Sequence, residues 1–393
     1  MRGALVVGLI EGPLAAERYR WNCKTLFVIL AAMADASLTT ELGHVMVTGG
    51  SGFVGANLVS QLLNRGCWVR SFDRVRSPLD GHSRHEVMEG DICDSDVVAA
   101  AVNGIDTVFH TAALIEPAGG RPVTEEYRRQ SWAINVGGTE NLVHAAQNAG
   151  VKRFVYTSSN SVVLSGKKIS GGDETLPYTA RFADPYTQTK VQAEKFVLSQ
   201  NGVGGMLTCA IRPSGIWGHG DKTMFRKIFE QVAAGKVKAL IGSRHAKLDN
   251  SYIDNLVHGF ILAAQHLVEK GTAPGQPYFI NDDDPVNMFE FARPIVEACG
   301  ERWPRFRISG RLVHAAMVVW QWLHARFRFP QPPLEPLAVE RLYLDNYFSV
   351  EKARRELGYQ PLYTTEQAMK ECLPYYVDLY RQVKAVGHEP TDA

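Results

Sequence analysis

The chain lacks paired cysteines, and this absence limits both its metal chemistry and its compartment. The six cysteines are scattered along 393 residues, and no two of them form a C-x-x-C pair. Zinc cages and disulfide frameworks depend on such spacings, so we expect neither, and no other metal centre. Unpaired thiols are typical of a reducing, cytoplasmic environment. The six are Cys23, Cys67, Cys93, Cys209, Cys299 and Cys372.

A surplus of charge is also missing. The 42 lysine and arginine residues nearly balance 41 aspartate and glutamate residues, the formal net charge is +1, and no long basic run occurs. Nucleic-acid-binding proteins usually carry a basic face or tail, so we expect no nucleic-acid partner. Hydrophobic residues make up 45% of the chain and charged residues 21%, which is typical of a folded globular protein. The length suffices for a large domain and a smaller lobe.

No apolar run is long enough to cross a bilayer. The run at residues 25–34, TLFVILAAMA, is too short for a spanning helix, although basic residues precede it. Ala32-Met33-Ala34 resembles a signal-cleavage site. Met33 is alternatively the working start, because the residues after it lead directly into the first expected strand. We favour a loose N-terminal extension over residues 1–42 and keep an exported or anchored protein as the alternative.

Short β-rich runs alternate with helical segments from His44 onward. Residues 56–64 and 139–148 show the apolar spacing of helices between such runs. This alternation predicts right-handed crossovers and a buried parallel sheet. The fold class that we predict is α/β, a doubly wound parallel sheet with its ligand site at the carboxyl ends of the strands. The β-rich runs are HVMVTG, WVRSFD, HEVMEGD, DTVFHTA, RFVYTSS and LTCAIRP.

The alternation weakens after Pro213. Three shorter β-rich runs follow, KALIGS, NSYIDN and PYFIND, and Pro, Trp and Phe become frequent from residue 303 to residue 347. This pattern predicts a smaller, discontinuous lobe that closes over the sheet edge and ends in a C-terminal helix. The predicted boundaries are 43–213 plus about 244–270 for the large domain, and 214–243 plus 271–385 for the smaller lobe.

A glycine-rich turn, TGGSGFVG, lies between the first β-rich run and the first helical segment. Gly49 suits the tight turn, Gly52 lets the backbone approach a pyrophosphate, and Gly55 allows close packing of helix and strand. At the helix start, the free N–H groups of Phe53 and Val54 attract negative phosphates. The turn therefore predicts a dinucleotide-binding site.

A carboxylate, Asp73, ends the second β-rich run. At that position a carboxylate binds the adenine-ribose hydroxyls and repels the extra phosphate of NADP, so we predict NAD as the cofactor. Arg74 would soften this preference, and Asp73 is alternatively a turn residue. Asp91 and Ile92 follow the third run, where adenine contact and turn chemistry are equally supported. Pro213, at the end of the sixth run, completes the predicted cofactor site.

Tyr186 and Lys190 form a Y-x-x-x-K spacing in PYTQTK, downstream of a serine-rich strand end that carries Ser159. Residues i and i+4 share one helix face, so the lysine ammonium can lie beside the phenol. A nearby ammonium favours the phenolate and lowers a tyrosine pKa that is ordinarily about 10. The phenolate would take a hydroxyl proton while a hydride leaves the same carbon for the nicotinamide. Ser159 would hold the substrate oxygen.

Several segments resemble a known family. TGGSGFVG, FHTAA, YTSSNS, PYTQTK and IRPSGIWG resemble the extended short-chain dehydrogenases/reductases, and the resemblance covers nearly all of residues 44–380. VTGGSGFVGANLV, SYIDNLVHGFILA and PYFINDDDPVNMFEF resemble the 3β-hydroxysteroid dehydrogenase/Δ5–Δ4 isomerase branch, most closely its bacterial cholesterol and 3β-hydroxysteroid dehydrogenases. The resemblance implies NAD-dependent oxidation of a steroid 3β-hydroxyl, of the cholesterol, pregnenolone or dehydroepiandrosterone type, to a ketone.

The resemblance also implies roles for single residues. Tyr186 matches the family's proton acceptor, Lys190 its ribose ligand and pKa modifier, and Ser159 its substrate-orienting serine. Asn135, in INVGGTEN, matches the asparagine that supports the lysine and the proton relay. Taken as a residue alone, Asn135 is alternatively a helix cap.

The same branch carries an isomerase expectation. Moving a double bond from Δ5 to Δ4 requires removal of a proton at C4 and its return at C6. Asp283 matches an aspartate to which this work is attributed in vertebrate relatives, but Phe279 stands where those relatives have a tyrosine. The departure puts the isomerase in doubt or moves it to other groups. The aspartates before Pro285 are alternatively a solvated turn.

A steroid pocket should be apolar with one polar end. Trp217, Met224 and Phe225 follow the sixth strand and are candidate walls or ordinary core residues. Residues 312–323 carry an apolar stripe at helical spacing, interpretable as a peripheral membrane contact or as a core helix of the smaller lobe. The stripe is Leu312, Ala315, Ala316, Val319, Trp320 and Leu323, with Arg311, Arg326 and Arg328 around it.

Three alternatives to the steroid dehydrogenase remain open. A sterol-4α-carboxylate 3-dehydrogenase shares the oxidation and then loses carbon dioxide. A sugar-nucleotide epimerase keeps the hydride on the enzyme. A dinucleotide-binding regulator without catalysis usually lacks the tyrosine and lysine, and both are present here. We keep a homodimer as the protein partner to be tested, beside the steroid substrate.

Overall fold

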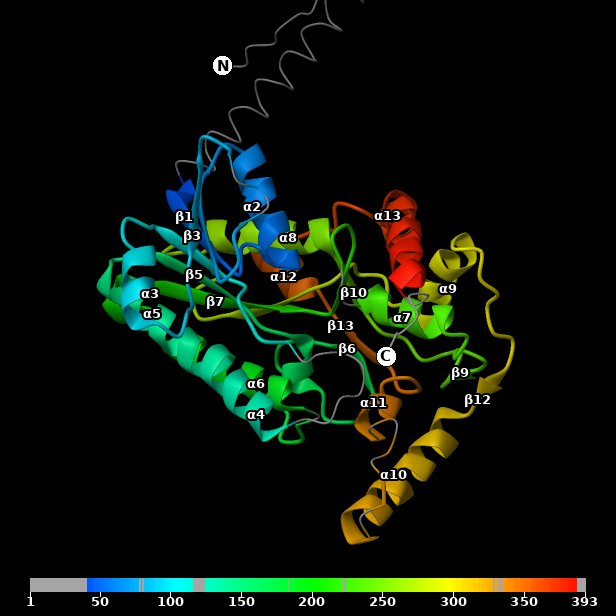
Figure 1. Cartoon of the computed structure of the whole chain (residues 1–393). Helices are drawn as coiled ribbons and strands as arrows, with labels where there is room; N and C mark the ends of the chain where they lie inside the picture. Colours follow the sequence, from blue (N-terminus) through cyan, green and yellow to red (C-terminus); the bar gives the residue numbers. More distant parts are fainter. Residues whose placement is uncertain are drawn as a thin grey trace, which may run out of the picture.

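A seven-stranded parallel sheet forms the centre of the molecule (Figure 1). The computed structural model describes residues 41–386, except 78, 80, 116–123, 183, 222–223, 328, 331, 333 and 335. The strand order is β11-β7-β5-β4-β1-β2-β3, and every neighbouring pair is parallel. The strands are β1 (His44–Thr48), β2 (Trp68–Asp73), β3 (His85–Glu89), β4 (Thr107–His110), β5 (Arg153–Thr157), β7 (Leu207–Pro213) and β11 (Pro277–Ile280).

Helices cover both faces of this sheet (Figure 1). α2 (Phe53–Asn64) and α8 (Ile253–Gln265) lie on one face. α3 (Ser95–Ala101), α5 (Thr139–Asn148) and α6 (Pro185–Ser199) lie on the other. The apolar side chains that the helical spacing singled out are buried against the sheet, among them Leu58, Leu62, Leu142 and Val143. The predicted doubly wound α/β fold is confirmed.

The order of the strands fixes where a ligand can bind. Strands β2 and β3 extend the sheet to one side of β1, whereas β4, β5 and β7 extend it to the other. A doubly wound sheet forms its ligand crevice at this reversal, beyond the carboxyl ends of the strands. The glycine turn follows β1, Asp73 ends β2 and Ser159 follows β5, so the predicted site residues meet at one edge of the sheet.

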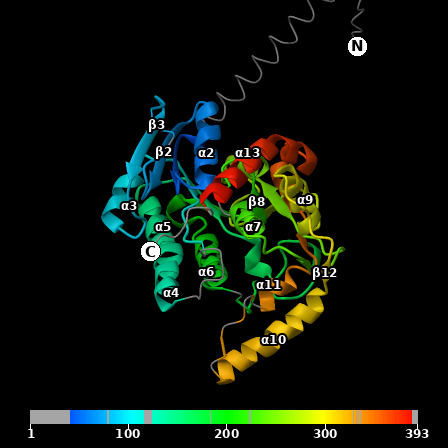
Figure 2. The same ribbon diagram turned by 45° about the vertical axis from the view of Figure 1, so that its right-hand side comes forward.

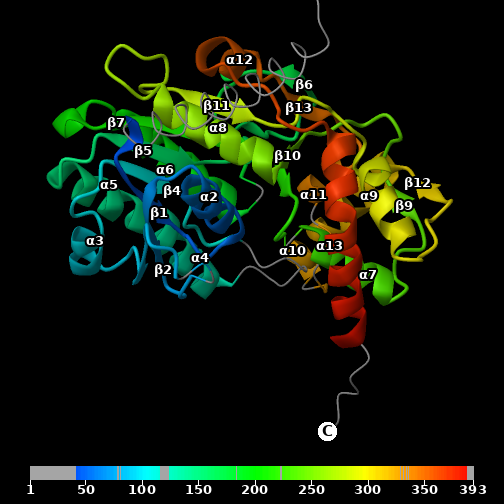
Figure 3. The same cartoon turned by 90° about the horizontal axis from the view of Figure 1, so that it is seen from above.

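Beyond β7 the chain builds a smaller part from short strand pairs and helices. Figure 3 shows α13 running beside α7 and α9. The strand pairs are β8 (Gly215–Trp217) with β10 (Asn250–Tyr252), β9 (Leu240–Ile241) with β12 (Arg307–Ile308), and β6 (Ile169–Gly172) with β13 (Asn346–Phe348). The helices are α7 (Met224–Ala233), α9 (Met288–Ala298), α10 (Gly310–Phe327), α11 (Pro336–Glu340), α12 (Glu351–Leu357) and α13 (Thr365–Val386).

One strand differs from the predicted division of the chain. The run PYFIND was assigned to the smaller lobe with residues 271–385, but its strand β11 pairs with β7 and extends the large sheet. A short apolar run has no periodicity that tells which sheet it joins. The other domain boundaries stay predictions. The predicted N-terminal extension lies outside the described residues except at its end, where Leu42 is fully buried in the core.

Two of the candidate pocket walls are core residues. Trp217 and Phe225 are fully buried, and the Trp217 indole donates to Asp282 Oδ2 at 2.9 Å. Only Met224, which is half-buried beside Gly215, stays a candidate wall. Among the described residues, no helix is long and apolar enough to cross a membrane, and no group of three metal-binding side chains comes together.

Candidate active site

The glycine turn has the geometry that a bound dinucleotide requires. Gly49 adopts a φ of +68°, and its N–H donates to the Phe72 carbonyl at 2.8 Å. A Cβ on Gly55 would lie 2.1 Å from the Gly49 oxygen, so only glycine permits this approach of α2 to the turn. Gly52 begins α2 as an exposed N-cap that offers no side-chain acceptor. The first N–H groups of the helix, at Phe53 and Val54, therefore point to an anion site.

Asp73 ties this turn to the end of β2. Its carboxylate accepts from the Ser51 N–H at 3.0 Å and from the Val75 N–H at 3.2 Å. The carboxylate is half-buried beside the turn, so lone pairs remain for ligand hydroxyls. Arg74, whose side chain is 63% exposed, extends from the same strand end toward Asp91. This arrangement supports a ribose contact by Asp73 and keeps the Arg74 side chain accessible to a ligand phosphate, although it lies 4.0 Å from Asp91.

The other predicted cofactor residues also lie at the carboxyl edge. Asp91 accepts from the Cys93 N–H at 2.9 Å and lies 4.0 Å from Arg74, so the turn interpretation is realised while the carboxylate stays partly exposed. Ile92 is buried, and its carbonyl accepts from the Asn141 amide at 2.8 Å. Pro213 ends β7, next to Ile280 of β11. Their contacts with a cofactor stay predictions.

Tyr186 and Ser159 lie near each other at the carboxyl edge of the sheet. Tyr186 lies in the first turn of α6, which begins at Pro185 after the N-cap Asp184, whose Oδ1 accepts from the Thr187 N–H at 2.6 Å. The Ser159 hydroxyl lies near enough to the phenol to influence its pKa, and both side chains are partly exposed. Desolvation by the surrounding protein raises the phenol pKa above its ordinary value, and the Ser159 hydroxyl opposes that rise.

Lys190 lies one turn further along α6, but its ammonium points to the backbone. Nζ donates to the Thr157 carbonyl at 2.6 Å and lies 5.7 Å from the centre of the Tyr186 ring. The side chain is buried, and desolvation lowers its pKa to about 7, which Glu194 partly opposes. Because the ammonium faces a strand-end carbonyl, the lowering of the Tyr186 pKa by Lys190 stays a prediction.

Asn135 is not a helix cap. It lies inside a π-helix, η1 (Ala133–Gly138), and is buried. Its Oδ1 accepts from the Leu114 N–H at 2.7 Å, and its Nδ2 donates to Thr189 Oγ1 at 3.1 Å, on the helix that carries Tyr186 and Lys190. Single π-turns inside helices often mark functional sites. The amide joins the loop after β4 to α6, which supports a positioning role.

A buried histidine connects the same asparagine to the sheet. His110 bonds Thr48 Oγ1 at 2.7 Å through Nδ1 and Thr139 Oγ1 at 2.9 Å through Nε2. The Thr139 hydroxyl donates in turn to the Asn135 carbonyl at 2.8 Å. Burial and the charge of Lys190 lower the pKa of His110 to about 3, so it stays neutral and acts as a relay of hydrogen bonds.

Sequence reasoning missed a buried ion pair behind the catalytic helix. Glu194 and Arg212 form a two-pronged contact, with Arg212 Nη2 at 2.6 Å and Nε at 3.0 Å from Oε1. Oε1 also accepts from the Tyr178 phenol at 2.8 Å, and Oε2 accepts from the Ser158 hydroxyl. Ser158 adjoins Ser159, so this cluster holds in place the strand end that carries Ser159. Glu194 follows Lys190 by four residues, and this spacing was the sequence feature that could have indicated a role for Glu194 on the same helix face.

The positions that the resemblance linked to isomerisation do not form an acid–base pair. Phe279 is fully buried, stacks on Phe348 at 4.4 Å between ring centres, and has the Arg212 guanidinium 5.3 Å from its own ring centre. Asp283 lies in an exposed turn with a φ of 53° and pairs with Arg354 at 2.7 Å. The interpretation of Asp283 as a surface turn residue is therefore favoured by its geometry.

Comparison with known proteins identifies the family of this chain. The 3-beta hydroxysteroid dehydrogenase/isomerase family model matches residues 46–308. The "3 beta-hydroxysteroid dehydrogenase/Delta 5-->4-isomerase" of Mycobacterium tuberculosis (strain ATCC 25618 / H37Rv) is 70% identical over 356 residues, 91% of this chain and 96% of the relative. The chain belongs to this family. The "3-beta-hydroxysteroid dehydrogenase" of Mycolicibacterium neoaurum is 66% identical over 361 residues, 92% of this chain and 99% of the relative.

Solved structures support the fold of this 3β-hydroxysteroid dehydrogenase/isomerase family member. A short-chain dehydrogenase/reductase superfamily protein from Agrobacterium tumefaciens, with bound NAD, superposes with a TM-score of 0.64 at 22% identity. The alignment covers 88% of this chain and all of that one. At this identity the likeness concerns the fold. The family predicted from the sequence motifs is confirmed by the family model and the relatives.

Proposed function

We propose that the protein is an NAD-dependent 3β-hydroxysteroid dehydrogenase that also moves the steroid double bond from Δ5 to Δ4. The pair of Tyr186 and Ser159 at the carboxyl edge, beside a glycine turn suited to a dinucleotide, supports the oxidation. The names of the two mycobacterial relatives support the steroid 3β-hydroxyl as the substrate group. Steroids of the cholesterol, pregnenolone and dehydroepiandrosterone type share that group.

The residues of this chain give each part of the oxidation. Ser159 holds the C3 oxygen through its hydroxyl, and the Tyr186 phenolate takes the hydroxyl proton. Bound NAD accepts the hydride that leaves C3. The Lys190 side chain is held by its hydrogen bond to the Thr157 carbonyl. When protonated, it supplies a positive charge near Tyr186, and it also contacts the ribose of the cofactor. The turn of Gly49, Gly52 and Gly55 holds the pyrophosphate through backbone N–H groups.

Isomerisation needs a second acid–base function. Phe279 has no titratable group, and the Asp283 carboxylate is engaged by Arg354 at the surface. This chain therefore takes its proton-transfer groups for the step between C4 and C6 from other positions. Oxidation comes first, because a ketone at C3 acidifies the C4 protons that must move.

A panel of steroids tests the proposed function. Purified protein with NAD and 3β-hydroxysteroids is expected to produce NADH, and a Δ5 substrate is expected to give the absorbance of a conjugated enone. A ketone product without that absorbance would contradict the isomerase activity and still support the dehydrogenase activity. Turnover restricted to UDP-sugars, or to sterols with a 4α-carboxylate, would contradict the substrate class proposed here.

Asp73 is expected to set the preference for NAD. Asp73→Asn removes a charged acceptor of the ribose hydroxyls, and hydrogen bonds to charged groups contribute about 1.5–3 kcal/mol. The variant should therefore bind NAD roughly 10 to 100 times more weakly and bind NADP better than the parent does. Fluorescence titration with both cofactors measures the change. Asp378→Asn, an exposed carboxylate on α13, serves as the matched control; an unchanged ratio in Asp73→Asn would contradict the assignment.

We also propose a peripheral membrane contact through α10. Much of the stripe predicted from the sequence faces outward, with Leu312 71% exposed and Val319 57%, and the neighbouring Trp322 is 59% exposed. The opposite face packs on α11 through the buried Met317 and through His314, which lies 3.0 Å from Glu340. Two members of the stripe, Trp320 and Leu323, are partly covered, and the Trp320 indole donates to the Pro330 carbonyl at 2.9 Å. The core-helix interpretation does not fit these exposures.

A further inference from the structure

Helix α10 projects from the body of the molecule next to a basic pocket. Figures 1 and 2 both show the helix extending away from the sheet below β12. The chain from residue 302 to residue 334 contains six arginines and no aspartate, glutamate or lysine. Three more apolar side chains on this stretch are strongly exposed, with Phe306 at 78%, Phe327 at 62% and Ile308 at 46%. Apolar residues bordered by arginine are typical of segments that lie on a lipid surface.

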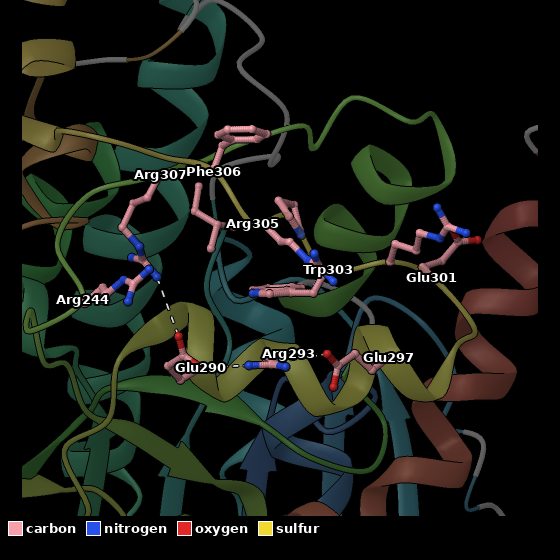
Figure 4. Close-up of a pocket in the computed structure, with 12 residues that line it drawn as sticks. Arg244, Glu290, Arg293, Glu297, Glu301, Trp303, Arg305, Phe306 and Arg307 are labelled. Atoms are coloured by element: carbon pink, nitrogen blue, oxygen red, sulfur yellow. Dashed lines mark hydrogen bonds and ion pairs between the residues drawn. The ribbon is translucent and has the colours of Figure 1, made fainter.

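The pocket itself has a volume of about 890 Å³ and lies between α9 and the segment that leads into β12. Figure 4 shows Trp303 above α9, with Arg244 and Arg307 to one side of it. Two of the lining arginines are engaged, because Arg293 pairs with Glu297 at 2.8 Å and Arg307 lies 3.7 Å from Glu290. These ion pairs hold the wall of the pocket in place.

Three other arginines of the wall keep their charge available. Arg244, Arg302 and Arg305 are exposed, and none has a carboxylate within ion-pair distance among the described residues. Arginine binds phosphate with a planar fork of N–H donors. Unpaired guanidinium groups around a tryptophan therefore favour a ligand that has both a phosphate group and an apolar part, as a phospholipid does.

We propose that this pocket, Arg244, Arg302 and Arg305 around Trp303, binds the headgroups of an anionic phospholipid bilayer while the exposed face of α10 enters its surface. The inference rests on the proposed membrane contact of α10 and adds the lipid class. A second copy of the chain fits this surface less well, because a two-fold contact would bring the same arginines against each other. An anionic bilayer brings opposite charge and an apolar interior to one surface.

Vesicle partitioning tests the headgroup site. The wild-type chain should bind phosphatidylcholine vesicles that contain phosphatidylglycerol more tightly than pure phosphatidylcholine vesicles, and added salt should reduce the difference. Each arginine near an anionic surface contributes roughly fivefold to partitioning, so Arg302→Gln/Arg305→Gln should lose roughly 25-fold on anionic vesicles and little on neutral ones. Trp322→Ser should weaken binding to both.

Matched variants separate the site from general charge. Lys270→Gln/Lys370→Gln removes two exposed positive charges elsewhere and should bind anionic vesicles as the wild type does. Equal binding of the wild type to both vesicles, an equal loss in this control, or self-association in place of vesicle binding would overturn the inference. Oxidation of detergent-solubilised steroid is measured in parallel, and it should be unchanged in every variant. Its absence in the wild type would instead overturn the proposed enzymatic function.

Discussion

Tyr186→Phe is expected to lower the rate of steroid oxidation by roughly 10²–10⁴-fold, the range of a positioned general base. The substitution removes only the phenol oxygen, whose pKa Ser159 lowers and which is proposed to take the substrate proton. The ring remains against Lys190, so α6 and the strand end should keep their packing. NADH production with a 3β-hydroxysteroid measures the loss, and NAD titration should give an unchanged affinity.

Tyr363→Phe is the matched control. It removes a phenol oxygen just before the start of α13 in the chain, outside the proposed site. It should oxidise steroid at the wild-type rate. A Tyr186→Phe protein that retains more than about a tenth of the wild-type rate would exclude the phenol as the base.

The pH profile distinguishes the base from a residue that only shapes the site. The phenol must lose its proton to act, and desolvation raises its pKa, so kcat/KM should rise with pH from neutral into the alkaline range. The Ser159 hydroxyl lowers that pKa. Ser159→Ala should therefore shift the rising limb to higher pH, in addition to a loss of about tenfold from the missing contact to the substrate oxygen. A limb at the same pH would contradict the link between the two hydroxyls.

The sequence predicted the sheet well because its strands are signalled locally. Each β-rich run from HVMVTG to LTCAIRP forms a parallel strand, and residues 139–148 form α5 as expected. The glycine turn and the Y-x-x-x-K spacing also depend on neighbours in the chain, so Gly49, Tyr186 and Lys190 were found without a structure. Their meeting at one edge follows from the parallel arrangement alone.

Features that depend on distant pairings escaped prediction. β11 pairs with β7 in the large sheet, although β7 lies more than sixty residues earlier in the chain. Because the two strands are so far apart in sequence, no local pattern indicates that they pair. The apolar spacing in α10 is the same for a buried helix and for an exposed one. The stripe is exposed because α11 packs on the opposite face of the helix, and the sequence does not indicate that packing. Arg212 lies in β7 and Glu194 in α6, so their contact could be predicted only with knowledge of the strand order.

The Glu194–Arg212 pair should be a major source of stability for the site. Both side chains are nearly inaccessible, with 0% and 2% exposure, and removal of one partner leaves an uncompensated buried charge. Glu194→Gln is therefore expected to lower the free energy of unfolding by about 3–5 kcal/mol. Urea unfolding, followed by tryptophan fluorescence, measures the change. The exposed pair of Arg226 and Glu230 on α7 gives the matched control, and Glu230→Gln should cost less than about 0.5 kcal/mol.

A double variant shows whether the cost comes from the unpaired charge. Glu194→Met/Arg212→Met replaces both charges with apolar side chains of similar length, and such replacements of buried pairs are often neutral or stabilising. It should recover most of the stability that Glu194→Gln loses, although the hydroxyls of Tyr178 and Ser158 lose their acceptor. Steroid oxidation should stay impaired in the double variant, because Ser158 no longer fixes the strand end beside Ser159. Full activity with restored stability would show that the pair stabilises the fold without positioning the catalytic hydroxyls.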